Sequence, residues 1–446
     1  MLNRFAADYL GGMAEAAFAP KAAISGRLSS CDGLLMEAVG LSLPVGTVCS
    51  IGADENGGAG SVEAEVIGFR NGRTLMMNLG GPAPLLPQAP VRPLGSPGEA
   101  QVGAVLLGRV IDGSGRPIDG LGPIRGATAW PLAGKLQSPL DRGRVLKPMD
   151  VGVRAINGLL TIGQGQRVGI MAGSGVGKSV LLGMMVRAAE ADVVVVGLIG
   201  ERSREVADFL ETKVAGAARE RAVVVAVPAN HSPVLRIRGA LRATAIAEAF
   251  RAEGRKVLLI IDSLTRVAHA GREIGLALGE PASARGYPPS AIAMLPNLIE
   301  RAGTCVASGG SITAIYTVLA DGDDGNDPVV DAARSILDGH IVLSRKLAER
   351  GVYPAIDLGP SVSRVMTDIA DRPHLAAARV LRRHLSTYEE NRDLVLMGAY
   401  RSGADPAVDR ALACHGAILQ YIRQDADETV DLATSVAELV GVFGDA

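Results

Sequence analysis

The 446 residues are enough for two or three domains, and a hydrophobic share of 48% is ample for buried cores. A formal net charge of −2 at pH 7 excludes a global basic field that would hold the protein on nucleic acid. The four cysteines are scattered without a Cys-x-x-Cys pair, which favours reduced thiols in a cytosolic protein over a disulfide framework or a zinc site.

The apolar runs of the sequence are too short to predict a membrane span. None approaches the ~20 residues that a spanning helix requires. The N-terminus also lacks the basic-then-apolar layout of a signal peptide. We therefore expect a soluble cytoplasmic protein.

The first predicted element is a short amphipathic helix within residues 1–21. Its apolar residues recur every three to four positions, at Leu2, Phe5, Tyr9 and Met13. A helix packed on its own protein and an arm that docks in a partner's groove show the same apolar stripe. Both interpretations remain open.

Residues 22–95 change to short alternating runs such as SVEAEVIGF and RTLMMNL, separated by Gly- and Pro-rich turns. Closely spaced runs of this kind predict strands. We expect a small β-barrel or sandwich here. The Pro-rich segment 82–99 is typical of an exposed connector.

Residues 96–365 carry apolar runs of strand length that alternate with longer helical patterns. Examples of the runs are RVGIMA, VVVVGLI and KVLLIID. This alternation predicts an α/β fold with a parallel sheet and helices on both faces. Residues 366–446 carry helical patterning alone, which predicts a helical C-terminal domain.

The segment AGSGVGKS, residues 172–179, follows a predicted strand and precedes a predicted helix. It has the pattern of a phosphate loop with alanine in place of the first glycine. Glycines let successive backbone N–H groups turn toward a phosphate chain, and the helix N-terminus adds its dipole. A glycine-rich structural turn is the alternative. The predicted nucleotide-binding residues are Gly173, Ser174, Gly175, Val176, Gly177, Lys178, Ser179 and Val180.

Within that loop, Lys178 is expected to reach the β and γ phosphates and the Ser179 hydroxyl to ligate Mg²⁺. KVLLIID ends a second strand on Asp262, where carboxyl ends of parallel strands face a ligand crevice. Asp262 is predicted to hold Mg²⁺ directly or through a bound group, although a helix cap would look the same.

The strand VVVVGLI leads to Glu201. ATP hydrolysis needs a carboxylate that polarises a water in line with the γ-phosphate, and Glu201 is the candidate. The alternative for Glu201 is a surface ion pair with Arg202 or Arg204. We expect such a pair for Glu205 instead.

The acidic segment 321–332, DGDDGNDPVVDA, does not fit a calcium loop. Its fifth position is Gly325 and its twelfth is Ala332 rather than glutamate. Asp327, which precedes Pro328, is better interpreted as a helix cap.

Taken together, the sequence resembles the RecA-like rotary ATPase family, which includes the catalytic β subunit of F1 ATP synthase and its secretion relatives. The resemblance covers residues 22–425 and implies a RecA-like P-loop NTPase core between the β-barrel and the helical domain. It also implies ATPase activity, with ATP and Mg²⁺ bound. Besides AGSGVGKS and GER, it rests on GRVIDGSGRPIDGLGPI (108–124), GEPASARGYPPS (279–290) and LAERGVYPAIDLGPSVSRVM (347–366).

Carried over position by position, the resemblance implies roles for four residues. Glu201 matches the catalytic glutamate and Arg202 an arginine near the γ-phosphate. Tyr353 matches the aromatic residue that packs against adenine, and Arg364 the arginine finger that reaches into the neighbouring subunit's site. One chain thus carries the loop with Lys178, the base and the finger, which implies a homohexameric ring with a site at every interface.

Within the family, the segments 150–185 and 391–411 are most similar to flagellar protein export ATPases. Virulence type III secretion ATPases are the alternative, and they commonly carry glutamate where this chain has Ala399. The resemblance implies a motor that energises unfolding, chaperone release and delivery of export substrates. It further implies peripheral attachment at the inner membrane face and no stable nucleic acid. The implied partners are a stator-like negative regulator at the N-terminal arm, a stalk-like coiled-coil protein, an export gate and chaperone–substrate complexes.

Two other function classes give contrasting expectations. A Rho-like nucleic-acid translocase would grip single strands with aromatic residues and basic grooves, but residues 22–95 hold one aromatic, Phe69. An ATP-binding subunit without turnover, like the α subunit of F1, would not need the carboxylate of Glu201.

Overall fold

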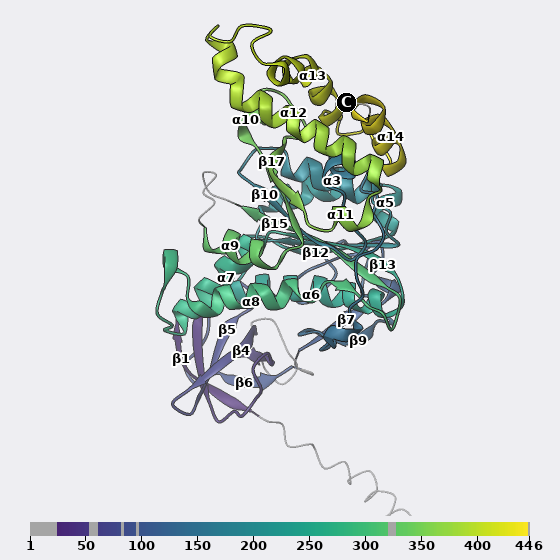
Figure 1. Ribbon diagram of the computed structural model, residues 1–446. Coiled ribbons are helices and arrows are strands. Elements are labelled where there is room, and N and C mark those ends of the chain that lie inside the picture. Colours follow the sequence, from purple (N-terminus) through teal and green to yellow (C-terminus); the bar gives the residue numbers. More distant parts are fainter. Residues whose placement is uncertain (1–24, 53–60, 82–83, 95–97, 320–326, 445–446) are drawn as a thin grey trace, which may run out of the picture. The chain divides into compact units, whose positions relative to one another are not determined.

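The computed structural model describes residues 25–52, 61–81, 84–94, 98–319 and 327–444. The predicted amphipathic segment 1–21 lies outside these residues. The chain divides into two compact units, with the boundary between Gly98 and Glu99 (Figure 1). No helix in the described ranges is long and apolar enough to cross a membrane.

The first unit is a closed barrel of antiparallel strands in the order β1-β2-β5-β4-β3-β6. Alternate side chains point inward, as Val62, Ala64 and Val66 do on one strand. This confirms the predicted N-terminal β-barrel. Its strands are β1 (Gly26–Asp32), β2 (Leu35–Val39), β3 (Val48–Ile51), β4 (Val62–Arg70), β5 (Arg73–Asn78) and β6 (Pro90–Pro93).

The second unit is built on a nine-stranded sheet in the order β17-β16-β10-β15-β13-β11-β12-β8, with β14 beside β15. Neighbours are parallel from β16 to β8, whereas β17 and β14 pair antiparallel. The strands are β8 (Val110–Ile111), β10 (Arg167–Ala172), β11 (Val193–Ile199), β12 (Ala222–Val227), β13 (Lys256–Asp262), β14 (Gly303–Thr304), β15 (Ser311–Leu319), β16 (Gly339–Leu343) and β17 (Ile356–Ser363). A separate pair joins β7 (Glu99–Val102) to β9 (Thr128–Pro131).

Helices cover both faces of this sheet, as predicted (Figure 1). One face packs on α6 and α7, with α8 against α7, and the other on α3 and the C-terminal helices. The helices are α2 (Arg154–Leu159), α3 (Lys178–Ala188), α4 (Ser203–Thr212), α5 (Ala217–Glu220), α6 (Pro233–Ala252), α7 (Leu264–Ala277), α8 (Pro289–Ile299), α9 (Pro328–Ile336), α10 (Arg345–Glu349), α11 (Met366–Ile369), α12 (Arg372–Leu396), α13 (Pro406–Ile422) and α14 (Leu432–Phe443).

Aspartates begin four of these helices. Asp327, Asp371, Asp405 and Asp431 each accept a backbone N–H from the first turn, at α9, α12, α13 and α14. A cap of this kind satisfies donors that the helix itself leaves unpaired. The interpretation of Asp327 as a helix cap is therefore confirmed.

Short α2 anchors the C-terminal helices to the sheet. Arg154 forms ion pairs with Glu428 at 2.8 Å and Glu438 at 2.9 Å. The side chain of Tyr421, on α13, lies against Gly158 of α2, and its hydroxyl donates to the carbonyl of Ser435 at 2.8 Å. The helical segment after residue 366 thus packs within the same compact unit as the sheet.

Gly158 of α2 is required by this packing. A Cβ at Gly158 would overlap the hydroxyl oxygen of Tyr421. Gly158→Ala is therefore expected to lower the free energy of unfolding by about 1–3 kcal/mol, which urea denaturation measures. In Tyr421→Phe the ring carbon Cζ, 3.0 Å from that Cβ, becomes the nearest atom, so this change should restore part of the loss.

The matched control is Gly416→Ala, because Gly416 lies within helix α13 and its added Cβ would meet no atom within 4 Å. This change should leave stability unchanged or raise it by up to about 1 kcal/mol, since alanine favours helix. Equal losses in both variants would contradict the role of the Tyr421 contact.

Candidate active site

The phosphate loop connects β10, which ends at Ala172, to α3, which begins at Lys178. Gly175 and Gly177 have φ values of 78° and 91°, a left-handed backbone that favours glycine. Val176 is buried, while Ser174 and Ser179 are exposed at the mouth of the loop. The N-terminus of an eleven-residue helix with open backbone donors is suited to bind phosphate.

Lys178 lies between the two predicted carboxylates. Its Nζ is 2.5 Å from Asp262 Oδ1 and 3.2 Å from Glu201 Oε1. These residues follow or end β10, β11 and β13, whose carboxyl ends meet at one edge of the sheet. The structure therefore brings together the three side chains that the sequence places separately.

Burial sets the electrostatics of this cluster. It raises the pKa of the Glu201 and Asp262 carboxyls above the ordinary values, and the Lys178 charge only partly opposes the shift. Burial alone would lower the pKa of Lys178, but the two carboxylates raise it above its usual value. A carboxylate with a raised pKa is a better proton acceptor, which suits Glu201 as a general base.

Ser179 and Asp262 fit a Mg²⁺ that is bound mainly by a nucleotide. Mg²⁺ prefers oxygen ligands and usually keeps waters and phosphate oxygens, with one or two protein ligands. In the described part of the chain, no cluster of three or more His, Cys, Asp or Glu side chains could hold a metal alone. Asp262 and the exposed hydroxyl of Ser179 would instead complete the shell of a phosphate-bound ion.

Tyr353 lies against the start of α3. Two of its ring atoms are 3.5 Å from where a Cβ on Gly177 would stand, and the side chain is about half exposed. An exposed ring beside a phosphate loop has a free face for a base. The placement agrees with the adenine contact that the resemblance implies.

Sequence reasoning missed two cations beside the loop. Arg345 Nη2 lies 3.5 Å from the Cβ position of Gly173, and Lys346 lines a cavity of about 250 Å³ with Gly173. Both follow Ser344, directly after buried β16. The sequence signal that could have identified Arg345 and Lys346 is their position just after a strand of the same sheet.

Arg202 faces solvent in this structure, and its role near the γ-phosphate stays a prediction. Its side chain is 85% exposed and pairs with Glu205 at 3.5 Å. Arg266, in the first turn of α7, packs against Gly200, the residue before Glu201: its Cβ is 2.6 Å from the Cβ position of Gly200. The Nε of Arg266 is buried without a hydrogen-bond partner in the described structure. The sequence signal that could have identified Arg266 is its position four residues after Asp262.

Arg364 lies away from the phosphate loop of its own chain. It follows β17, and Ser363 pairs with Gly339 at the start of β16, whereas Leu343 at the end of β16 pairs with Ala172. Gly339 and Leu343 are the two ends of β16, so Arg364 and the start of the phosphate loop are about 13 Å apart along the strand direction. The backbone N–H of Arg364 donates to Asp338, which Arg167 holds by an ion pair at 3.0 Å.

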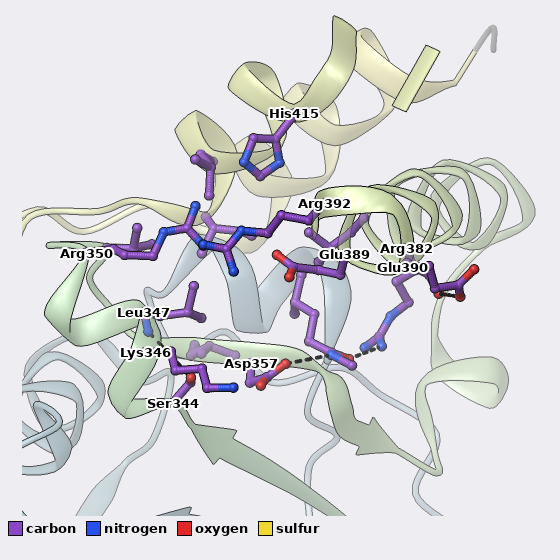
Figure 2. A pocket seen from close by; sticks show the side chains of 18 of the residues that line it. Ser344, Lys346, Leu347, Arg350, Asp357, Arg382, Glu389, Glu390, Arg392 and His415 are labelled. Carbon is purple, nitrogen blue, oxygen red and sulfur yellow. Dashed lines mark hydrogen bonds between the residues drawn. The ribbon is translucent and has the colours of Figure 1, made fainter. Parts of the chain in front are cut away.

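A cavity of about 790 Å³ separates β17 and α10 from α12 and α13. Figure 2 shows that Arg350 and Arg392 enter it from opposite walls, below His415 and beside Glu389. Its lining holds four cations, Lys346, Arg350, Arg382 and Arg392, and four carboxylates, Glu349, Asp357, Glu389 and Glu390. These formal charges balance, whereas the phosphate loop offers backbone N–H groups at a helix N-terminus.

Two family models match the chain. The nucleotide-binding domain of the ATP synthase alpha/beta family matches residues 152–363, which contain the cluster around Lys178. The C-terminal domain of the T3SS EscN ATPase matches residues 370–441, which contain α12, α13 and most of α14. The RecA-like core and the helical C-terminal part of the predicted fold are thereby confirmed.

Full-length relatives are similar along nearly the whole chain. The flagellum-specific ATP synthase of Pseudomonas aeruginosa is 49% identical over 97% of this chain and 96% of its own. The flagellum-specific ATP synthase of Salmonella typhimurium is 49% identical over 96% of each. The type 3 secretion system ATPase of Pseudomonas syringae pv. tomato is 44% identical over 94% of each.

Among solved structures, the assembled ATPase EscN of the enteropathogenic E. coli type III secretion system is similar with a TM-score of 0.88 and 39% identity. The similarity covers 94% of this chain and 100% of that chain. EscN in complex with its central stalk EscO gives a TM-score of 0.85 and 38% identity over the same shares.

Proposed function

The chain belongs to the family of flagellum-specific ATP synthases and type III secretion ATPases, and we propose that it is the ATPase of a flagellar protein export apparatus. The observation that supports the flagellar assignment is the 49% identity to two flagellum-specific relatives, against 44% to a type 3 secretion ATPase. Identity does not separate the two classes throughout, because the flagellum-specific ATP synthase of Bacillus subtilis is 42% identical.

In the reaction, the phosphate chain of ATP binds the backbone N–H groups of residues 173–179 and the N-terminus of α3. Lys178 exchanges its carboxylate partners for the β and γ phosphates. Glu201, freed from that ion pair, accepts a proton from the water that attacks the γ-phosphorus, and ADP leaves with phosphate as the second product. Mg²⁺, held by Ser179 and Asp262, would neutralise charge on the phosphates.

A homohexameric ring completes the site. Arg364 lies a strand length from its own phosphate loop, so it serves a neighbouring chain's γ-phosphate. A head-to-tail interface that closes into a ring gives every loop one such arginine. Support comes from the similarity to EscN, which is described as assembled.

We propose the partners that the family resemblance implies, of which the stalk has support from a solved structure. EscN binds a central stalk, EscO, and we assign a stalk-like coiled-coil protein to this chain. A stator-like negative regulator at the N-terminal arm, an export gate and chaperone–substrate complexes complete the set. The ring then works in the cytoplasm, attached peripherally at the inner face of the membrane.

Cross-complementation tests the flagellar role. Expressed in Salmonella typhimurium without its own flagellum-specific ATP synthase, this chain should restore filaments and swimming, since the two are 49% identical over 96% of each. Glu201→Gln is the inactive control. Rescue of a secretion-deficient type III strain, with no rescue of swimming, would assign the chain to virulence secretion.

A further inference from the structure

Thr317 places a hydroxyl next to the metal-binding carboxylate. It lies on β15, between β10 and β13, where Thr317 pairs with Ile170 and the preceding Tyr316 pairs with Ile261. The strand is apolar around it, and Thr317 is fully buried. Burying a hydroxyl costs free energy unless it is hydrogen-bonded, so the hydrogen-bond partner of Thr317 indicates its role.

That partner is Asp262. The Thr317 hydroxyl donates to Asp262 Oδ1 at 2.6 Å, and Lys178 Nζ donates to the same oxygen at 2.5 Å. Among the described residues, no donor engages Oδ2. One oxygen of the carboxylate is therefore held twice, and the other stays free for a ligand.

The two donors differ in what happens when nucleotide binds. Lys178 is recruited by the phosphates, so its bond to Asp262 is temporary. Thr317 has no such second partner, and its β-branched side chain has a restricted χ1. The end of β15 is also fixed, because the N–H of Leu319 donates to Thr265 Oγ1 of α7 at 2.8 Å.

We propose that Thr317 is a positioning residue for Asp262: its hydroxyl keeps Oδ1 in place after Lys178 leaves, so that Oδ2 remains available to Mg²⁺. This rests on the proposed function, in which Asp262 serves the nucleotide-bound metal. A partner that orients a metal-binding carboxylate typically raises the metal affinity about 10- to 100-fold.

The test is binding of Mn²⁺ to the full-length protein with saturating ADP, followed by electron paramagnetic resonance of free Mn²⁺. Thr317→Val should weaken Mn²⁺ binding about 10- to 100-fold. Thr317→Ser keeps the hydroxyl and should bind Mn²⁺ almost as tightly as the wild type, whereas Thr317→Ala should bind it as weakly as Thr317→Val. Comparing Thr317→Ser with Thr317→Ala isolates the hydroxyl even if Thr317→Val does not fold.

Thr313→Val is the matched control. Thr313 is buried on the same strand, and its hydroxyl accepts the N–H of Gly165 at 2.8 Å without contact to a carboxylate. Its Mn²⁺ affinity should equal that of the wild type. Equal losses at Thr313 and Thr317, or equal binding by serine and alanine at position 317, would overturn the proposal.

Asp262→Asn separates this inference from the proposed function. If it weakens Mn²⁺ binding while Thr317→Ala does not, Asp262 serves the metal and the role of Thr317 is refuted. If Asp262→Asn binds Mn²⁺ as the wild type does, the metal role of Asp262 fails and the inference fails with it.

Discussion

Glu201→Gln is expected to lower kcat by about 10²- to 10⁴-fold, because the amide cannot accept the proton of the attacking water. Nucleotide binding should persist, since Lys178 remains available to the phosphates and the loop backbone is unchanged. Removing a negative charge near the γ-phosphate should leave ATP affinity equal or tighter. Phosphate release and titration with a fluorescent nucleotide measure the two effects separately.

Glu211→Gln is the control for this change. Glu211 lies on the same helix α4, is exposed, and is not part of the cluster around Lys178. Its turnover should stay within about twofold of the wild type, as for other surface substitutions. Normal turnover of Glu201→Gln would remove Glu201 from the role of base.

Arg364→Ala should lower kcat by about 10³- to 10⁵-fold, the contribution typical of an arginine finger. Nucleotide affinity of the isolated chain should not change, because Arg364 lies at the opposite end of β16 from the phosphate loop. Arg364→Lys should remain far below the wild type, since lysine lacks the planar fork of guanidinium donors.

Mixing two inactive variants tests whether Arg364 acts on a neighbour. Lys178→Ala disables the loop of its own chain but supplies Arg364, and Arg364→Ala supplies an intact loop. If the ring proposal holds, random mixing makes about a quarter of the interfaces complete, so activity should return. If each chain used its own arginine, the mixture would stay inactive.

The control for the mixture is the double variant Lys178→Ala with Arg364→Ala, mixed with Lys178→Ala. No interface in it has a working loop, so no activity is expected. Activity that returns there as well would trace the recovery to contaminating enzyme and contradict the shared site.

The periodicity of the sequence predicted the layers of the fold but not the contacts between distant strands. The valines at 193–196 are fully buried in β11, as a central parallel strand requires, and the alternation in β4 predicted the barrel. Such patterns report burial, which is local in sequence. The pairing of Thr317 with Asp262 depends on the register of β15 against β13, which no local pattern encodes.

The arginines illustrate the same limit. Arg202 directly follows Glu201, yet it is the N-cap residue of α4 and its side chain faces solvent. Arg266 is 65 positions further along the chain, yet it packs against Gly200 because α7 starts beside the end of β11. Arg202 was predicted because it adjoins Glu201 in the sequence, whereas Arg266 comes close to Gly200 only in the folded chain.

The edges of the barrel and of the large sheet are protected. The barrel closes on itself and leaves no edge, β8 at one end of the large sheet is two residues long, and β17 at the other end contains Pro360. An unprotected edge would pair with another chain and start an aggregate. Many copies of this protein can therefore be concentrated in one place, as a ring demands, without joining by strand exchange into fibres.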